Sequence, residues 1–156
     1  MQKKKLLIAM FVLALAGLGI AGYSFAHHEQ FVSGSFCTIG ATFNCDTVNR
    51  GAFSEILGIP VALFGVIGYF FLAITAFATM RLRDRNLPKL LVAEASLGLA
   101  FALYLSGLEA FVIHSWCLLC LSSQIIMLGI FAISVAVIKI GSIEKSELRN
   151  QNSEIS

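Results

Sequence analysis

The sequence predicts an all-α integral membrane protein: a four-transmembrane-helix bundle with a short interfacial helix in its outer loop. Hydrophobic residues make up 58% of the chain and charged residues only 13%, and the mean hydropathy is +0.86. These values are far from the balance of a soluble domain. Four apolar segments reach the length of about 20 residues that a helix needs to cross a bilayer. They lie over roughly residues 6–26, 60–80, 90–113 and 117–138.

The four spans use most of the 156 residues and leave room for one domain. We expect a membrane domain over residues 1–140, with an outer loop at 27–59, followed by a polar cytoplasmic tail at 141–156. The first span follows three lysines and so imitates a secretory signal. Its uncharged stretch from Leu6 to Ala26 is longer than the core of about 7 to 15 residues that a signal peptide has. We therefore expect it to be retained as a transmembrane helix.

The basic residues predict the orientation, because short cytoplasmic loops carry an excess of lysine and arginine. Of the eleven basic residues, only Arg50 falls in the outer loop. The other ten flank the spans on the opposite side: Lys3, Lys4, Lys5, Arg81, Arg83, Arg85, Lys89, Lys139, Lys145 and Arg149. We expect a multi-pass protein of the inner (cytoplasmic) membrane with both termini in the cytoplasm. The net charge of +2 then reflects topology and does not indicate a nucleic-acid partner.

All four cysteines fall on the outer, oxidising face in this topology. Cys37 and Cys45 lie in the outer loop, and Cys117 and Cys120 lie at the outer end of the fourth span. Residues three apart share one face of a helix, so Cys117 and Cys120 can close a disulfide. The start of a helix also stabilises a thiolate, which is the nucleophile in thiol–disulfide exchange. The pair therefore suits redox chemistry.

Two alternatives for the cysteines involve no exchange. A permanent disulfide would staple the outer loop, and Cys117 and Cys120 would be ordinary small buried residues. A zinc site is the other alternative, but seven residues separate Cys37 from Cys45, whereas two to four are usual between zinc ligands. We expect no metal, and the gathering of all four cysteines on one face favours a relay.

The outer loop contains the run DTVNRGAFSEILGIP, which predicts a short helix in the plane of the interface. Gly58 and Pro60 are expected to end it. Its apolar residues fall toward one side: Val48, Phe53, Ile56 and Leu57. Cys45 stands just before the start of this helix, near favourable dipole charge. Cys37 lies upstream, where we expect it to be accessible to a partner.

Two acidic residues, Glu94 and Glu109, lie in the third span near its two ends. Acids inside a membrane are candidates for function, but a position near the interface also allows simple solvation. The sequence leaves both roles open.

The cysteine runs CTIGATFNC and WCLLC, and the segment CDTVNRGAFSEILGIPVALFGVIGY between them, resemble the vitamin K epoxide reductase family, specifically its bacterial and archaeal homologues. The resemblance covers roughly residues 5–140. Two cysteine pairs occur in the family's order, with the family's number of spans between them. The resemblance implies a four-helix bundle around a quinone, with thiol chemistry at the outer surface.

The resemblance also implies a role for each cysteine. Cys37 and Cys45 match the loop pair, and Cys117 and Cys120 match the active-site pair. Electrons would enter from a reduced thioredoxin-like partner, pass through a mixed disulfide between Cys45 and Cys117, and leave through Cys120 to the quinone. No thioredoxin-like domain follows the bundle in this sequence, so we expect a separate thioredoxin-like partner. It would be similar to the periplasmic dithiol oxidase that introduces disulfides into secreted proteins.

The sequence departs from the family pattern at three positions. The family often has a hydroxyl residue where this chain has Gly51, and Ser54 is the nearest replacement. Vertebrate members have quinone-contacting Asn and Tyr side chains where this chain has Val61 and Gln124. We therefore expect ubiquinone or menaquinone rather than vitamin K epoxide, with Gln124 available to donate to a quinone carbonyl.

Two rival interpretations remain at this point. An unrelated four-helix bundle of enterobacteria performs the same reaction, but its CxxC pair comes first in the chain, whereas here it comes second. The other rival is a non-enzymatic four-helix membrane protein held by structural disulfides.

Overall fold

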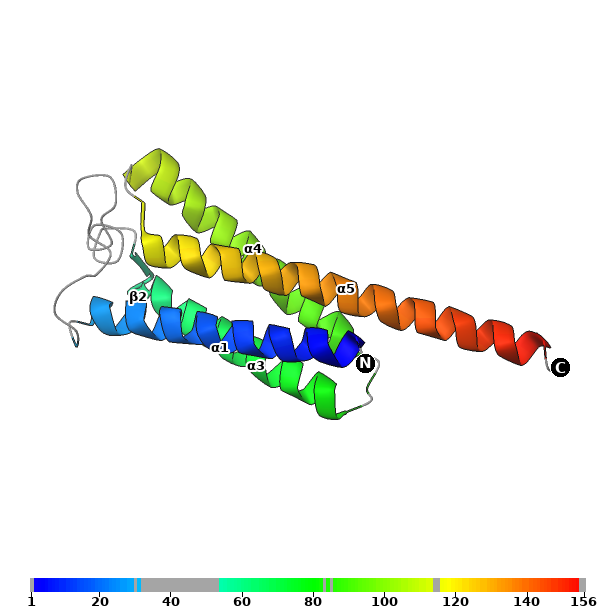
Figure 1. The fold of residues 1–156 in the computed structure, drawn as a ribbon. Coiled ribbons are helices and arrows are strands. Elements are labelled where there is room, and N and C mark those ends of the chain that lie inside the picture. Colours follow the sequence, from blue (N-terminus) through cyan, green and yellow to red (C-terminus); the bar gives the residue numbers. More distant parts are fainter. Residues whose placement is uncertain are drawn as a thin grey trace.

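The computed structural model describes residues 2–29, 31, 54–82, 84, 86–113 and 116–154. Four long helices dominate these residues (Figure 1). They are α1 (Gln2–His28), α3 (Val61–Arg81), α4 (Leu87–Leu108) and α5 (Leu118–Glu154). Each is long and apolar enough to cross a membrane, which confirms the predicted class of an all-α four-helix membrane bundle. Spanning segments adopt helices because every backbone N–H and C=O must be paired within the apolar phase.

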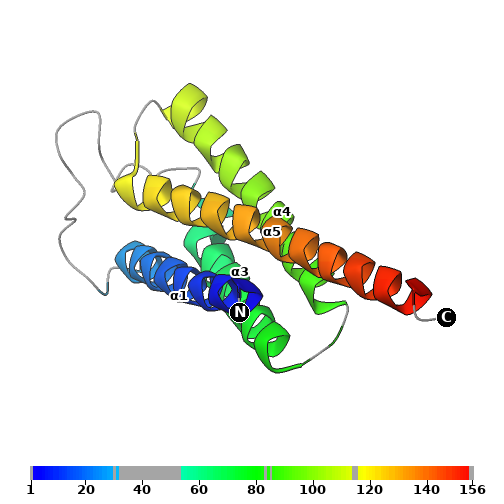
Figure 2. The same ribbon diagram turned by 45° about the vertical axis from the view of Figure 1, so that its right-hand side comes forward.

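The helices form a bundle in which α1 packs against both α3 and α5, and α4 packs mainly against α5. Toward its C-terminal end α4 diverges from α1 and α3, as Figures 1 and 2 show from two directions. We call this end of the bundle, where α1 ends and α5 begins, the cysteine end. The divergence opens a space between α4 and the other helices that side chains line, as described below.

Small residues bring the helices together in the core. Ala14, Ala73, Ala76 and Ala95 are all buried at helix contacts, and side chains of this size allow close approach in the absence of a hydrophobic driving force between helices. The outer surface carries large apolar side chains, including Phe70, Phe71, Phe77, Leu97 and Leu103, each at least 47% exposed. A soluble monomer rarely exposes apolar surface to this extent, so the surface is suited to lipid.

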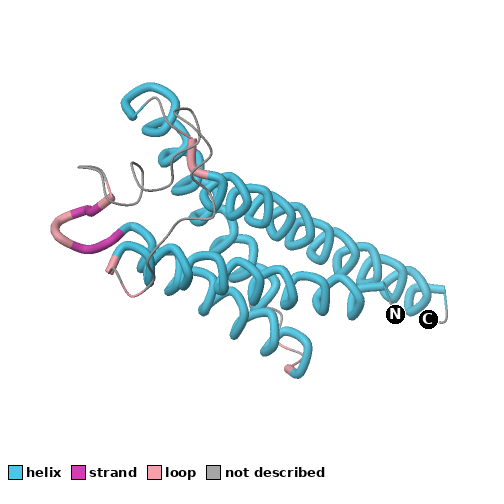
Figure 3. Tube along the Cα trace, turned by 60° about the vertical axis from the view of Figure 1, so that its left-hand side comes forward, coloured by secondary structure: helices cyan, strands magenta, loops and turns pink. Residues whose placement is uncertain are grey.

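A two-stranded hairpin precedes α3, with β1 (Glu55–Ile56) antiparallel to β2 (Ile59–Pro60). Figure 3 shows it in magenta at the cysteine end. Its turn residues, Leu57 and Gly58, both have positive φ, 56° and 78°, as the type I′ two-residue hairpin turn requires. The expected interfacial helix is therefore wrong over its described end, at Ile56 and Leu57. Its remainder, up to Phe53, lies outside the described residues.

The boundaries of the helices extend the predicted spans. A π-helical turn, η1 (Glu109–Ile113), continues α4, and α5 runs on to Glu154 through most of the tail expected at 141–156. This tail contains no proline, and its segment EKSELR, residues 144–149, consists of residues that favour helix apart from one serine. Its polar character therefore ends the apolar span without ending the helix, and α5 protrudes beyond the other helices in Figure 1.

Candidate functional site

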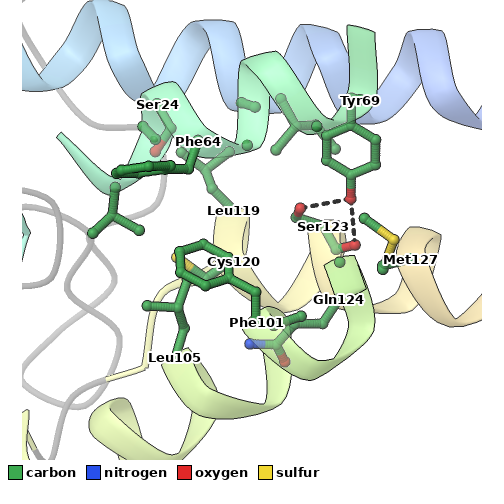
Figure 4. Close-up of a pocket in the computed structure, with 18 of the residues that line it drawn as sticks. Ser24, Phe64, Tyr69, Phe101, Leu105, Leu119, Cys120, Ser123, Gln124 and Met127 are labelled. Atoms are coloured by element: carbon green, nitrogen blue, oxygen red, sulfur yellow. Dashed lines mark hydrogen bonds between the residues drawn. The ribbon is translucent and has the colours of Figure 1, made fainter. Parts of the chain in front are cut away.

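The cysteine end contains a mainly apolar pocket, lined by residues from all four long helices. The rings of Phe64 of α3 and Phe101 of α4 line it, with ring centroids 6.1 Å apart and ring planes tilted by 54° (Figure 4). Cys120, Ser123 and Gln124 line it from the first turns of α5. The pocket thus has aromatic walls and a thiol.

Cys117 caps the N-terminus of α5. Its carbonyl accepts the first helical hydrogen bond, from the amide of Leu121 at 2.9 Å. Its Sγ accepts a hydrogen bond from the backbone amide of Cys120, at 3.4 Å. A side-chain acceptor at this position satisfies an amide that the helix itself leaves unpaired. Because Cys120 follows Cys117 by three residues, its backbone amide is the one that the Cys117 sulfur meets at the start of the helix.

The two cysteines occupy different environments. Both are thiols in the structure. Cys120 is partly exposed and lines the pocket, whereas Cys117 is fully buried and does not line it. A hydrogen bond from the Cys120 side chain lowers the pKa of Cys117 below its ordinary value, against the opposing effects of burial and of the Glu109 charge. Cys117 therefore holds a thiolate more readily than an ordinary cysteine does.

Glu109 lies beside both cysteines, at the junction of α4 and η1. It is only 2% exposed and lines the pocket. Its Oε2 accepts a long hydrogen bond from the backbone amide of Cys117, at 3.4 Å. The sequence marked this residue as a candidate and left open whether it was solvated; the structure shows that it is buried against the cysteine pair.

Tyr69 and Ser123 form a polar pair in the pocket wall about one helical turn further from the cysteine end than Cys120. The Tyr69 hydroxyl donates to the Ser123 carbonyl at 2.8 Å and also lies 2.8 Å from Ser123 Oγ (Figure 4). Tyr69 is 2% exposed. This pair was not predicted from the sequence, although a tyrosine in the middle of an apolar span signals a buried hydroxyl that needs a partner.

Further polar residues line the pocket: Ser24, His28 and Ser54. The Nε2 atom of His28 lies 3.3 Å from Oε1 of Glu55, which links the end of α1 to the hairpin. Ser54 is buried, and its carbonyl accepts from the amide of Val61 at 2.8 Å. Ser54 therefore lies where its hydroxyl can contact a pocket ligand.

The other predicted positions divide into two groups. Gln124 lies one turn beyond Cys120 and lines the pocket, as does Val61 at the start of α3. Cys37, Cys45 and Gly51 lie outside the described residues. Within the described part of the chain, no three His, Cys, Asp or Glu side chains gather into a possible metal site.

The pocket fits the head group of a quinone. A flat, mostly apolar ring suits the aromatic walls formed by Phe64 and Phe101. Hydroxyl groups of Tyr69 and Ser123 lie in the wall, where a ring oxygen could meet them, and the Cys120 thiol lines the same pocket. The arrangement can bring a lipid-soluble oxidant to a thiol.

The chain matches a known protein family. The model described as "Vitamin K epoxide reductase family" matches residues 8–135. The matched region includes α3 and α4, α1 from residue 8 onward, and α5 as far as residue 135, which is just under half of that helix.

Proposed function

Because the chain belongs to the vitamin K epoxide reductase family, and is therefore a multi-pass membrane protein of a family of quinone-linked thiol oxidoreductases, we propose that it reoxidises a thioredoxin-like dithiol protein on the periplasmic side of the inner membrane. The electrons pass through two cysteine pairs to a membrane quinone. The reaction supports disulfide formation in secreted proteins.

One observation carries this proposal: the CxxC pair straddles the wall of an apolar pocket. Cys120 lines the pocket, and Cys117 lies next to it outside the lining. An electron relay from an aqueous dithiol to a lipid-soluble acceptor needs this kind of division between two sulfur atoms. A structural disulfide between residues three apart would close a very short loop and so restrict the unfolded chain little. The pair is thus better suited to exchange than to stapling.

The cysteine residues perform the steps in order. The partner's dithiol reduces the Cys37–Cys45 pair, and Cys45 then attacks Cys117 of the Cys117–Cys120 disulfide, releasing Cys120 as a thiolate. Cys37 then attacks Cys45 of this mixed disulfide, which re-forms the Cys37–Cys45 disulfide and frees Cys117. The two protons of the loop thiols pass to the CxxC pair, so Cys117 and Cys120 are then both thiols. This dithiol gives two electrons to the acceptor in the pocket, and a bond between the Cys117 and Cys120 sulfur atoms restores the disulfide. The quinone supplies the oxidising power, since it takes up two electrons and two protons. In the net reaction the partner's dithiol becomes a disulfide.

The pocket lining supports an ordinary ubiquinone or menaquinone. Val61 and Gln124 both line the pocket. They stand where vertebrate members have the Asn and Tyr side chains that contact the quinone. The Val61 side chain forms no hydrogen bond and Gln124 has no phenol, so these two contacts are absent. Tyr69 and Ser123 supply hydroxyl groups in the wall instead. Gln124 adds an amide donor.

The experiment follows quinone reduction by the purified protein in detergent, with a reduced thioredoxin-like donor and a soluble quinone. We expect steady reduction by the wild type and none by Cys120→Ala. Ser122→Ala is the matched control, because Ser122 is exposed and its hydroxyl donates to the carbonyl of Leu118 in its own helix, at 2.8 Å. Equal rates in wild type and Cys120→Ala would contradict the proposal and favour a non-enzymatic protein.

A further inference from the structure

Glu109 is a buried carboxyl at the reacting end of the pocket, and the relay of cysteines alone leaves it without a role. Its Oε1 atom is buried and has no hydrogen-bond partner in the part of the chain that the structure describes. Burying a carboxyl group without full pairing is costly, in a membrane above all. A side chain that is 2% exposed and only half paired therefore points to a function beyond packing.

The carboxyl of Glu109 touches the reacting groups directly. Its Oε2 accepts from the amide of Cys117, and its side chain interacts with the thiol of Cys120. The same residue lines the pocket. One carboxyl thus connects the sulfur that loses a proton with the space that holds the electron acceptor.

The reaction requires proton movement at this place. Two thiols lose two protons and two electrons when a disulfide forms, and a quinone takes up the same number when it becomes a quinol. The neighbouring titratable groups of the pocket have other partners: His28 pairs with Glu55, and Tyr69 bonds Ser123. Among the described residues, Glu109 is the one base in contact with Cys120 that has an unpaired oxygen.

We propose that Glu109 is a catalytic residue that takes the proton from the Cys120 thiol and delivers it to an oxygen of the quinone head group. This inference rests on the proposed function. Glu109 begins and ends each turnover as a carboxylate. The electron pair comes from the cysteine sulfurs, and the proton from Cys120 reaches one ring oxygen. The proton of Cys117 is released to solvent. Solvent supplies one proton to the second ring oxygen, so the protons balance. General acid–base groups of this kind act within hydrogen-bond reach of the proton they move.

The position of Glu109 depends on the wide turn at the end of α4. The amide of Glu109 still bonds within α4, to the carbonyls of Leu105 and Ser106, and the π-helical turn η1 starts at the same residue. Such turns often mark functional sites, because they change the direction of side chains relative to a regular helix. Here the turn coincides with the residue that faces the cysteine pair.

The test uses Glu109→Gln, which keeps the shape and an oxygen acceptor for the Cys117 amide but cannot accept a proton. Glu94→Gln is the matched control, since Glu94 lies on the same helix, bonds Thr75 Oγ1 at 3.0 Å and does not line the pocket. Reduced protein is mixed with a soluble quinone, and re-formation of the Cys117–Cys120 disulfide is followed in a single turnover. We expect Glu109→Gln to slow this step by about 10²- to 10⁴-fold, the usual contribution of a general acid–base group, and Glu94→Gln to leave it unchanged.

A second measurement needs no quinone. The Cys120 sulfur carries a hydrogen for the Glu109 carboxylate in the dithiol state and none in the disulfide state. An infrared difference spectrum between these states, prepared with a soluble dithiol and a disulfide oxidant, should therefore contain a shifted carboxylate band that Glu109→Gln removes and Glu94→Gln keeps. Glu109→Asp retains a carboxyl, so we expect it to keep a band and to restore part of the rate that Glu109→Gln loses. These two results also separate proton transfer from a loss of folding.

The outcomes distinguish this inference from the proposed function. Wild-type reoxidation rates in a folded Glu109→Gln variant, or a carboxylate band that persists in it, would overturn the role of Glu109. A wild-type dithiol that no quinone oxidises would instead overturn the proposed function, and the infrared measurement would still decide whether the Glu109 carboxylate bonds the Cys120 thiol.

Discussion

The ring of Tyr69 packs directly on the backbone of Gly17, so that a Cβ atom added at Gly17 would overlap the ring. Gly17 lies on α1 and Tyr69 on α3. This contact between two helices sets the depth at which the Tyr69 hydroxyl meets Ser123. The absence of one side chain on α1 therefore positions a polar group in the wall of the pocket.

Gly17→Ala should displace Tyr69 and damage the pocket. We expect a loss of about 1–3 kcal/mol of stability, as overpacked cores show, and a raised KM for the quinone because the Tyr69 hydroxyl moves from Ser123. Thermal unfolding in detergent and quinone titration measure the two effects. Gly19→Ala is the control, since a Cβ atom there meets nothing within 4 Å. If both variants behave alike, the contact does not position Tyr69.

Tyr69→Phe should keep the packing and remove the hydroxyl. The loss of a buried hydrogen bond costs about 1 kcal/mol, and we expect a several-fold rise in the KM for quinone with little change in the rate of exchange with the partner. Steady-state kinetics with varied quinone test this. Tyr104→Phe is the control, because Tyr104 is 57% exposed and lies outside the pocket lining. An unchanged KM in Tyr69→Phe would remove this hydroxyl from the quinone site.

The reactivity of Cys117 should depend on pH and on its neighbour. The hydrogen bond from Cys120 lowers the pKa of Cys117, so its thiolate forms at a lower pH than an ordinary thiolate does. Cys120→Ala removes the donor, raises the pKa of Cys117 and should move its alkylation curve to higher pH. Below the pKa, each unit of this shift slows alkylation about tenfold, because the thiolate is the reactive form.

This curve is measured in a background in which Cys37 and Cys45 are replaced by Ser, with the modified peptide identified by mass spectrometry. Ser122→Ala, which leaves Cys120 in place, should follow the parent curve. Coincident curves with and without Cys120 would show that this thiol does not stabilise the Cys117 thiolate.

The order of transfer in the outer loop predicts a trapped intermediate. The resemblance assigns partner exchange to Cys37 and Cys45, so removing Cys45 deprives a mixed disulfide on Cys37 of its resolving thiol. Cys45→Ala should therefore accumulate a covalent adduct with the reduced donor's thiol at Cys37, visible on a non-reducing gel. The double variant that also lacks Cys37 should not form it. The absence of an adduct in Cys45→Ala would count against the loop pair as the entry point.

Some positions of the fold were predictable because their cause is local. Segments long enough to cross a bilayer must form helices wherever they lie in the chain, so the four spans followed from length and polarity. The hairpin at Glu55–Pro60 was not predictable in this way. Its apolar residues are too few to distinguish a helical period from a strand period, and the paired strands with positive φ at Leu57 and Gly58 decided the outcome.

The sequence by itself determined the class of protein, the four spans, and the position of Cys117 and Cys120 at the start of a helix, since length, hydropathy and residue spacing act within one segment. The resemblance carried by the cysteine runs indicated the family, which the match over residues 8–135 confirms. The predicted topology and the roles of Cys37 and Cys45 stay predictions.

Only the tertiary structure decided which polar groups share the pocket. Tyr69 and Ser123 are 54 residues apart in the chain, and Glu109 meets Cys120 because α4 and α5 pack together. Near the end of a span, sequence alone cannot tell a solvated acid from a buried one. The packing of helices removes the ambiguity, because burial and hydrogen bonding depend on what the neighbouring helices place beside a side chain.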